Sequence, residues 1–237
     1  MALPKLNSTP KYTMKIPTTQ ENVAFRPFLI KEEKTMLIAA ESGNPRNVLM
    51  SMIDTLKACC DDDINLKKLA TFDIEYMFLQ LRSKSVGETA TVGITCEDCG
   101  HKNKLEVNLE DIKIKVPEKI EKVVELTDQI KVELDYPSYH DILSSDSADN
   151  ITGAEQLFEL MNFVFKTVIT NDERINLKEV SKKELTDFID SMDSKQFSKI
   201  KDFIQEIPKL KHDYELTCEG CNKQIKNTLE GLTNFLS

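Results

Sequence analysis

The stretch TCEDCGHKNK, residues 95–104, is matched near the end of the chain by TCEGCNKQIK, residues 217–226. In both stretches Thr-Cys-Glu-x-Cys follows a segment of alternating apolar and polar residues and precedes a second, lysine-bearing segment. Alternation with a period of two is typical of strands, so each CxxC pair is expected at the tip of a β-hairpin. The two turns should therefore have the same form.

The paired turns predict a metal site. Zinc prefers four tetrahedral nitrogen or sulfur ligands, and a two-residue gap directs both thiolates of a CxxC pair toward one ion. Nearby backbone amides can donate to the sulfurs. We therefore expect a split zinc ribbon holding one structural Zn²⁺ per chain. Its predicted ligands are Cys96, Cys99, Cys218 and Cys221.

The separation of the two pairs is unusual for a zinc ribbon. Between Cys99 and Cys218 lie 118 residues, whereas an ordinary ribbon has about 15–20. A shared site is compatible with this distance if strands of both hairpins lie in one sheet and the intervening chain returns to its start. The alternative is two separate turns, reduced or oxidised in pairs.

Other roles for the cysteines fit the pattern less well. A thioredoxin-like pair belongs at the start of a helix, and neither CxxC precedes one. A catalytic zinc needs an open position, which four thiolates do not leave, although His101 in place of one cysteine could open the site. Such a histidine in a turn is more often a surface residue. Cys59 and Cys60 are adjacent and are expected to be buried or incidental thiols.

Composition sets limits on the class of protein. The chain has 237 residues, of which 40% are hydrophobic and 30% charged, with a formal net charge of -9. It is long enough to bury a substantial core, as one domain or two associated ones. The acidic balance argues against nucleic-acid binding through a global positive field, though not against a local basic patch. No apolar run approaches the length of about 20 residues that a membrane span needs, and the start lacks the apolar centre of a signal peptide, so we expect the protein to be cytosolic where it is made.

The first 87 residues are expected to combine a β-hairpin with a small helical bundle. Alternation on both sides of a polar turn in YTMKIPTTQENVAFRPF, residues 12–28, predicts a hairpin or an edge strand. Apolar residues then recur three or four positions apart, with Asn44 placed to cap the second helix. Helices are expected over 29–40, 44–60 and 72–84. A core stripe is expected in the third, at Ile74, Met77, Phe78 and Leu81.

Strand periodicity returns around the first CxxC pair and again in QIKVELDYP, residues 129–137. Residues 154–169 then look helical, with Thr152 and Glu155 as a capping box. A second box is expected at Ser181 and Glu184, and a cap at Ser194. The fold class is therefore α+β, with a helical insertion between the two knuckles. The expected segments are 1–87 (hairpin and helices), 88–150 (first knuckle and strands), 151–208 (helical insertion) and 209–237 (second knuckle).

The sequence offers little for catalysis. Its histidines, His101, His140 and His212, form no HExxH arrangement, and the common phosphate-binding and nucleophile-elbow motifs are absent. Acidic clusters such as residues 61–63 lack the spacing of a calcium loop and are expected to be solvated. We therefore predict a protein that is not an enzyme and has no catalytic residue or small-molecule substrate.

Several phrases, taken in order, resemble a known family. They are PKLNSTPKYTMKIPTT (4–19), FRPFLIKEEKTMLIA (25–39), LKKLATFDIEYMFLQLRSKSVGE (66–88), VELDYPSY (132–139) and the final CxxC hairpin. Together they resemble the baseplate hub proteins of T4-like contractile-tailed phages, a family that contains a small hub subunit and a related hub-assembly factor. FRPFLIKEEK is the most specific of these phrases, and the likeness covers most of the chain.

The resemblance implies a late phage protein that builds the tail baseplate hub, made in the host cytoplasm and located in the virion. Its implied partners are other hub proteins: the spike-bearing hub, the tape measure and assembly factors. One alternative is a hub-assembly chaperone that is absent from the particle. Another is a zinc-ribbon regulator of transcription, but such a ribbon would be expected to carry basic and aromatic residues on its knuckle strands. The return strands carry lysines and no aromatic residue.

Overall fold

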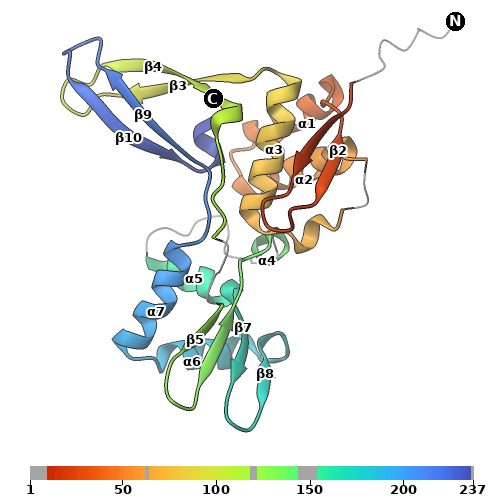
Figure 1. The fold of residues 1–237 in the computed structure, drawn as a ribbon, viewed down its shortest axis with the longest axis vertical. Helices are drawn as coiled ribbons and strands as arrows, with labels where there is room; N and C mark the ends of the chain where they lie inside the picture. The colour runs from red at the N-terminus through yellow and green to blue at the C-terminus, as the bar shows by residue number, and fades with distance from the viewer. Residues whose placement is uncertain (1–9, 62–63, 118–121, 144–153, 236–237) are drawn as a thin grey trace, which may run out of the picture. The chain divides into compact units, whose positions relative to one another are not determined.

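The computed structural model describes residues 10–61, 64–117, 122–143 and 154–235. It shows an α+β protein in which helices and small antiparallel sheets both occur (Figure 1). The chain divides into two compact units. Unit 1 comprises Met1–Leu66, Phe72–Val116 and Lys209–Ser237, and unit 2 comprises Lys67–Thr71 and Pro117–Pro208.

This division differs from the four segments expected from the sequence. The main part of unit 2 is Pro117–Pro208, so it takes the end of the segment 88–150 together with the whole of 151–208. Both CxxC hairpins belong to unit 1, along with the N-terminal hairpin and helices. Most of unit 2 is thus one long insertion between the two CxxC hairpins.

The N-terminal hairpin of unit 1 forms as predicted. Strands β1 (Tyr12–Lys15) and β2 (Asn22–Phe25) pair antiparallel, with Met14 opposite Val23. Alternate residues face inward because strand side chains alternate between the two faces. The buried set is Met14, Ile16, Val23 and Phe25.

The predicted helices are also present, as α1 (Ile30–Glu41), α2 (Pro45–Cys59) and α3 (Thr71–Ser85). The Asn44 side chain accepts hydrogen bonds from the backbone N–H groups of Arg46 and Asn47, which satisfies donors that a helix start leaves unpaired. The α3 stripe is core, as expected, with Ile74, Met77 and Leu81 fully buried. A short helical turn, η1 (Leu66–Lys68), precedes α3.

One partly buried ion pair fixes the junction between β2, α1 and α2, inside the phrase FRPFLIKEEK. Arg26 Nη2 lies 2.9 Å from Glu32 Oε1 and also donates to the Ala58 carbonyl at 2.9 Å. Glu32 accepts a further hydrogen bond from the Leu29 N–H. Phe28, between them, is buried. The phrase is therefore a structural junction that joins three elements.

The two CxxC hairpins form separate two-stranded sheets in the described part of the chain. One pairs β3 (Thr89–Thr95) with β4 (Lys102–Asn108), and the other pairs β9 (Lys211–Thr217) with β10 (Gln224–Glu230). The four cysteines therefore come together without a shared sheet, because the hairpins meet through their turns rather than through a common ladder of strands. Helical turns η2 (Leu109–Asp111) and η4 (Leu232–Phe235) follow the respective hairpins.

Unit 2 is built on a four-stranded antiparallel sheet in the order β5-β6-β7-β8. Its apolar core includes Val132, Met161, Phe165 and Ile200. The strands are β5 (Val123–Glu125), β6 (Lys131–Leu134), β7 (Phe165–Ile169) and β8 (Arg174–Asn176). The helices are α4 (Tyr139–Leu143), α5 (Ala154–Val164), α6 (Lys182–Asp190) and α7 (Ser194–Gln205), with a turn η3 (Leu177–Glu179).

The insertion is not helical throughout, which corrects the prediction for residues 154–169. Helix α5 ends at Val164, and Phe165–Ile169 forms strand β7 between β6 and β8. The segment FKTVI contains three consecutive β-branched residues, which favour strands, and the neighbouring strands satisfy its backbone. An apolar run cannot by itself distinguish a buried helix from a buried strand.

The helix caps of unit 2 agree in part with the sequence. Ser181 and Glu184 form the predicted capping box of α6. The cap of α7 is Asp193 rather than Ser194, and its side chain accepts from the N–H groups of Lys195 and Gln196. Asp193 is the stronger cap because its carboxylate also favours the positive end of the helix dipole. Thr152, predicted to cap α5, lies outside the described residues.

Replacing Arg26 tests the junction. Arg26→Met leaves the buried Glu32 carboxylate without its main partner, so we expect the free energy of unfolding to fall by about 2–4 kcal/mol in denaturant titrations. Lys31→Met is the matched control, because Lys31 Nζ contacts the same Glu32 oxygen at 3.3 Å from a side chain that is 70% exposed. Lys31→Met should lower the free energy of unfolding by less than about 1 kcal/mol. Equal costs for the two variants would contradict this assignment.

The same ion pair predicts a pH dependence. Burial alone would raise the pKa of Glu32, but the hydrogen bonds from Arg26 and Leu29 outweigh it and lower that pKa. The stabilisation is therefore complete above the pKa of an unfolded glutamate and is lost as pH falls through the folded value. We expect the difference between the wild type and Arg26→Met to shrink on acidification.

Candidate metal centre

The two CxxC hairpins of unit 1 run side by side in Figure 1, with their turns at the same end. In each hairpin two seven-residue strands pair in a continuous register, from Thr95 opposite Lys102 in the first and from Thr217 opposite Gln224 in the second. The strand pairing confirms the prediction that each CxxC lies at the tip of a hairpin.

The two turns have the same backbone. In the first, the Cys96 N–H donates to the His101 carbonyl and the Gly100 N–H to the Cys96 carbonyl, at 2.8 and 2.9 Å. In the second turn, the Cys218 N–H donates to the Lys223 carbonyl and the Asn222 N–H donates to the Cys218 carbonyl, again at 2.8 and 2.9 Å. Gly100 and Asn222 occupy equivalent positions with φ of +72° and +60°. Glycine and asparagine tolerate this left-handed conformation better than other residues do.

The four predicted ligand residues come together. All four Sγ atoms lie within 4.8 Å of one another. The Cys96 and Cys221 sulfurs are 3.8 Å apart, and those of Cys99 and Cys218 are 3.6 Å apart. These distances are too long for disulfides, and the cysteines are free. A tetrahedron with metal–sulfur bonds of about 2.3 Å has ligand separations of about 3.8 Å, so the cluster could hold a metal ion such as zinc.

The thiols of the cluster cannot all ionise without a cation. Burial opposes ionisation of Cys218, but hydrogen bonds from the Cys221 and Gly220 N–H groups and from Asn103 lower its pKa to about 6. For Cys99 the His101 N–H favours the thiolate, but desolvation and the neighbouring thiols outweigh it and raise its pKa to about 12. The thiolate of Cys218 is therefore stabilised, whereas ionisation of the neighbouring Cys99 is disfavoured. A divalent cation would supply the compensating charge.

Asn103 is a buried polar residue of the site that the sequence analysis missed. Its Nδ2 lies 3.6 Å from the Cys218 sulfur, and its Oδ1 accepts the Glu219 N–H at 2.9 Å. It thereby links the first hairpin to the second turn while only 3% exposed. The strand pattern could have revealed it, because residue 103 lies on the same buried face of β4 as Val107. A polar residue on such a face, where apolar side chains are usual, suggests a specific hydrogen-bonding role.

Contacts between the turns follow an approximate two-fold pattern. His101 Nε2 lies 3.8 Å from Glu219 of the second turn, and Lys223, at the position equivalent to His101, pairs with Asp98 of the first. These pairs are exposed and therefore contribute little energy. His101 is not part of the sulfur cluster. Its side chain is 41% exposed, in agreement with the expectation of a surface residue.

The remaining cysteines take no part in the cluster. Cys59 is buried at the end of α2, and desolvation raises its pKa to about 11, which makes it unreactive. Cys60 is half-buried, and its backbone bridges to Phe25. Both agree with the prediction of buried or incidental thiols.

Comparison with known proteins gives one result. A protein-family model described as T4 bacteriophage base plate protein matches residues 9–237, nearly the whole chain. Searches of curated proteins and of solved structures each returned no match.

Gly220 tests how closely the turns approach each other. A Cβ atom at this position would lie 2.7 Å from His101 Cβ and 3.3 Å from the Cys99 sulfur, so the turns would have to separate. We expect Gly220→Ala to lower the free energy of unfolding by about 1–3 kcal/mol. Gly93→Ala, on β3 of the same hairpin pair, is the control, because no heavy atom lies within 4 Å of its added Cβ. Similar losses in both variants would show that the contact with His101 does not matter.

Proposed function

The chain belongs to the T4 bacteriophage base plate protein family, and we propose that it is a non-enzymatic structural or assembly protein of the central hub of a contractile tail baseplate. The observation that carries this proposal is the family match over residues 9–237. Its expected partners are other baseplate hub proteins: the spike-bearing hub, the tape measure and assembly factors. No helix among the described residues is long and apolar enough to cross a membrane.

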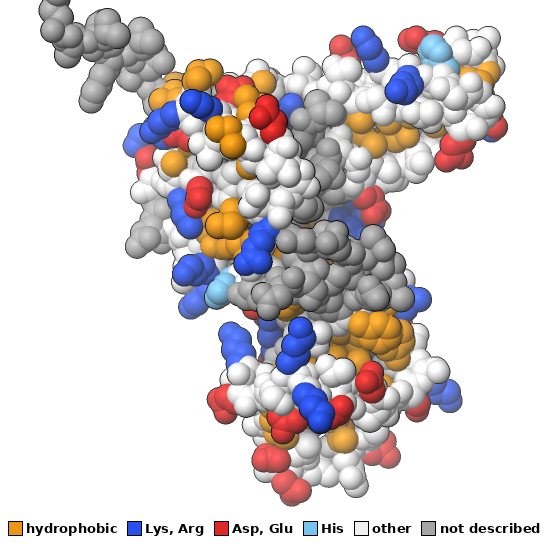
Figure 2. All heavy atoms as spheres, turned by 180° about the vertical axis from the view of Figure 1, so that it is seen from behind, with side chains coloured by type: hydrophobic (Ala, Val, Ile, Leu, Met, Phe, Trp, Pro, Cys, Tyr) orange, Lys and Arg blue, Asp and Glu red, His pale blue; other side chains and the backbone are white. Residues whose placement is uncertain are grey.

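An exposed apolar surface on α1 supports the proposal that the protein acts by binding other proteins. The side chains of Ile30, Leu37 and Ile38 are 76%, 59% and 59% exposed, and Met50 on α2 is 47% exposed. Figure 2 shows hydrophobic side chains lying among charged ones on the helical part of unit 1. An apolar helix face left in water is costly, and such surfaces commonly mark contacts with other proteins. The α1 surface is therefore our candidate for a hub contact.

The sulfur cluster would serve this function as a structural zinc site. Four thiolates leave no open coordination position, so the ion would stabilise the hairpin pair and would not activate a water molecule. Binding of a structural zinc can contribute on the order of 10 kcal/mol to folding when the unfolded chain has no preformed site. The ion would hold together the two hairpins that flank the inserted unit 2.

Two other functions remain as alternatives. A hub-assembly chaperone would share the partners but be absent from the finished particle. A zinc-ribbon regulator would bind nucleic acid, and the exposed lysines at 102, 104, 223 and 226 are the feature that favours it. The net charge of -9 opposes it.

Metal analysis tests the zinc proposal. We expect about one zinc per chain in the reduced protein and its loss after either Cys96→Ser or Cys218→Ser, because each change removes one of four shared ligands. Cys60→Ser is the control, since Cys60 lies outside the cluster. A shared site would be contradicted if the reduced wild type contained no zinc, or if each variant still contained about half a zinc ion per chain.

Mass spectrometry of purified phage particles and of infected cells tests the hub proposal. A stoichiometric amount in particles identifies a subunit, and presence in infected cells but not in particles identifies the chaperone alternative. We expect Leu37→Gln with Ile38→Gln to reduce co-purification with hub proteins at unchanged stability. Lys34→Gln changes an exposed polar residue of the same helix and should leave co-purification with hub proteins unchanged. Salt-dependent DNA binding without any hub association would favour the regulator instead.

A further inference from the structure

Strand β5 in unit 2 has backbone hydrogen-bonding groups on its outer side. It is one of the two edge strands of the sheet, and no strand in the described part of the chain pairs with that side. The Leu134 N–H donates to the Lys122 carbonyl, and the Leu126 N–H donates to the Ile130 carbonyl, at 2.6 and 2.9 Å. Because alternate residues of an antiparallel strand face the partner strand, the backbone groups of Val123 and Glu125 point away from β6. Such an edge is a template for another strand.

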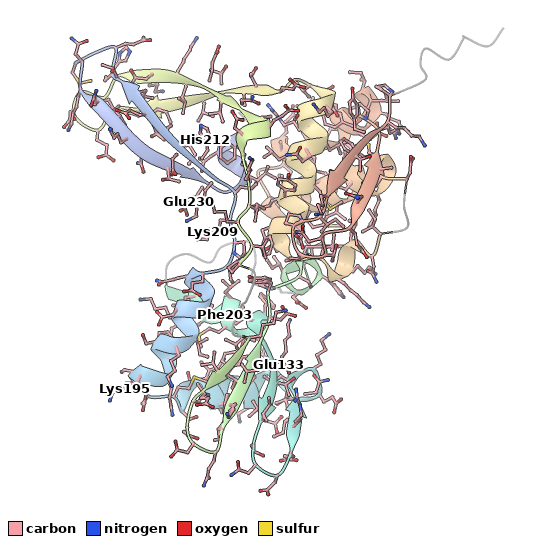
Figure 3. The ribbon with its side chains drawn as sticks, viewed as in Figure 1. Glu133, Lys195, Phe203, Lys209, His212 and Glu230 are labelled. Atoms are coloured by element: carbon pink, nitrogen blue, oxygen red, sulfur yellow. The ribbon has the colours of Figure 1, made fainter. Side chains whose placement is uncertain are left out.

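Helix α7 flanks this edge and leaves a groove beside it. Gln196 Nε2 donates to the Leu126 carbonyl at 3.3 Å, and Lys199 Nζ donates to the outward Glu125 carbonyl at 2.6 Å. An open groove of about 740 Å³ then lies between the strand and the helix. Phe203, which Figure 3 labels on α7 beside the strands, is a buried apolar residue of its lining. The groove thus combines an apolar contact with the backbone groups of Val123, which have no hydrogen-bond partner among the described residues.

The charges along the groove favour a basic occupant. Asp202 lies on α7, and Glu206, four residues later, is the C-cap residue of that helix. Both are exposed and make no ion pair with any residue that the structure describes. The charge of Lys122 is compensated by Asp135 at 2.7 Å, whereas Lys199 keeps its positive charge because it donates to a neutral backbone carbonyl. Two unpaired carboxylates therefore lie beside one uncompensated ammonium, so the excess charge at the groove is negative, as is the charge of the chain as a whole.

We propose that the groove between β5 and α7 binds an extended, lysine- or arginine-bearing segment of a partner protein. The segment adds to the edge of β5 as a further strand, through the N–H and C=O of Val123 and the N–H of Glu125. Its basic side chain lies against Asp202 and Glu206. The segment's own N–H replaces Lys199 at the Glu125 carbonyl, so Lys199 closes this edge in the free protein. This interaction goes beyond the proposed hub function and does not depend on it.

A second copy of this chain suits the groove less well. Pairing two β5 edges about a two-fold axis places the same surface of each copy against itself. The unpaired carboxylates of Asp202 and Glu206 would then be brought nearer to their own counterparts, and like charges disfavour such an approach. A partner segment that brings positive charge avoids this repulsion between carboxylates.

Peptide titration of the full-length protein tests the charge component. The probe is a capped ten-residue peptide of alternating threonine and lysine, and the comparison peptide has glutamate in place of lysine. We expect binding of the lysine peptide alone, weakened about tenfold or more by Asp202→Asn with Glu206→Gln. Asp187→Asn with Asp190→Asn removes the same charge from exposed positions on α6 and is the matched control. Equal weakening by both pairs would overturn the proposal, because it would indicate attraction to net charge only.

The strand component has a separate test. Val123→Pro removes one outward N–H and is compatible with the first residue of an edge strand, whereas Val123→Thr keeps the N–H. We expect the proline variant alone to lose binding, and the amide NMR signals of Val123 and Glu125 to shift when the peptide binds to the wild type. Unchanged binding by the proline variant would overturn strand addition. Concentration-dependent dimerisation that the proline variant abolishes would overturn the partner segment in favour of a second copy.

Discussion

The meeting of the two CxxC turns is the constraint on which unit 1 depends. It joins residues more than a hundred positions apart, and ordering so long a loop carries an entropic cost that local hydrogen bonds do not offset. The turns contact each other at the tip through four sulfurs, and the chain is held again at the base by the bridge between Lys113 and Lys211. Most of unit 2 is inserted between these two contacts. Changes in the sequence of unit 2 can therefore leave the contact between the two hairpins of unit 1 intact.

Charge explains why such a site suits a metal. Four thiols this close cannot all lose their protons, and the low pKa of Cys218 beside the high pKa of Cys99 expresses that conflict. A bound divalent cation removes it, so metal binding and closure of the hairpin pair would be a single event. A bound ion would in this way make the hairpin pair rigid without an enlarged apolar core.

Sequence reasoning succeeded where the signal was local. The helices of unit 1, the hairpin turns and the Ser181 cap follow from periodicity and from the chemistry of single residues. It failed at β7, because FKTVI is apolar enough for either a helix or a strand and only its neighbours β6 and β8 decide. It also overlooked Asn103 and Gly220, whose roles depend on a second hairpin that is distant in the chain.

The sequence by itself determined the local geometry of the candidate site: two identical turns, each with paired cysteines and a residue that tolerates a left-handed backbone. Tertiary structure alone decided that the turns face each other from separate sheets, that Ile30, Leu37 and Ile38 of α1 are exposed, and that β5 lies at an edge of the described sheet. The physical reason is that turn geometry arises from neighbouring residues, whereas burial and strand partnership depend on what the rest of the chain brings into contact.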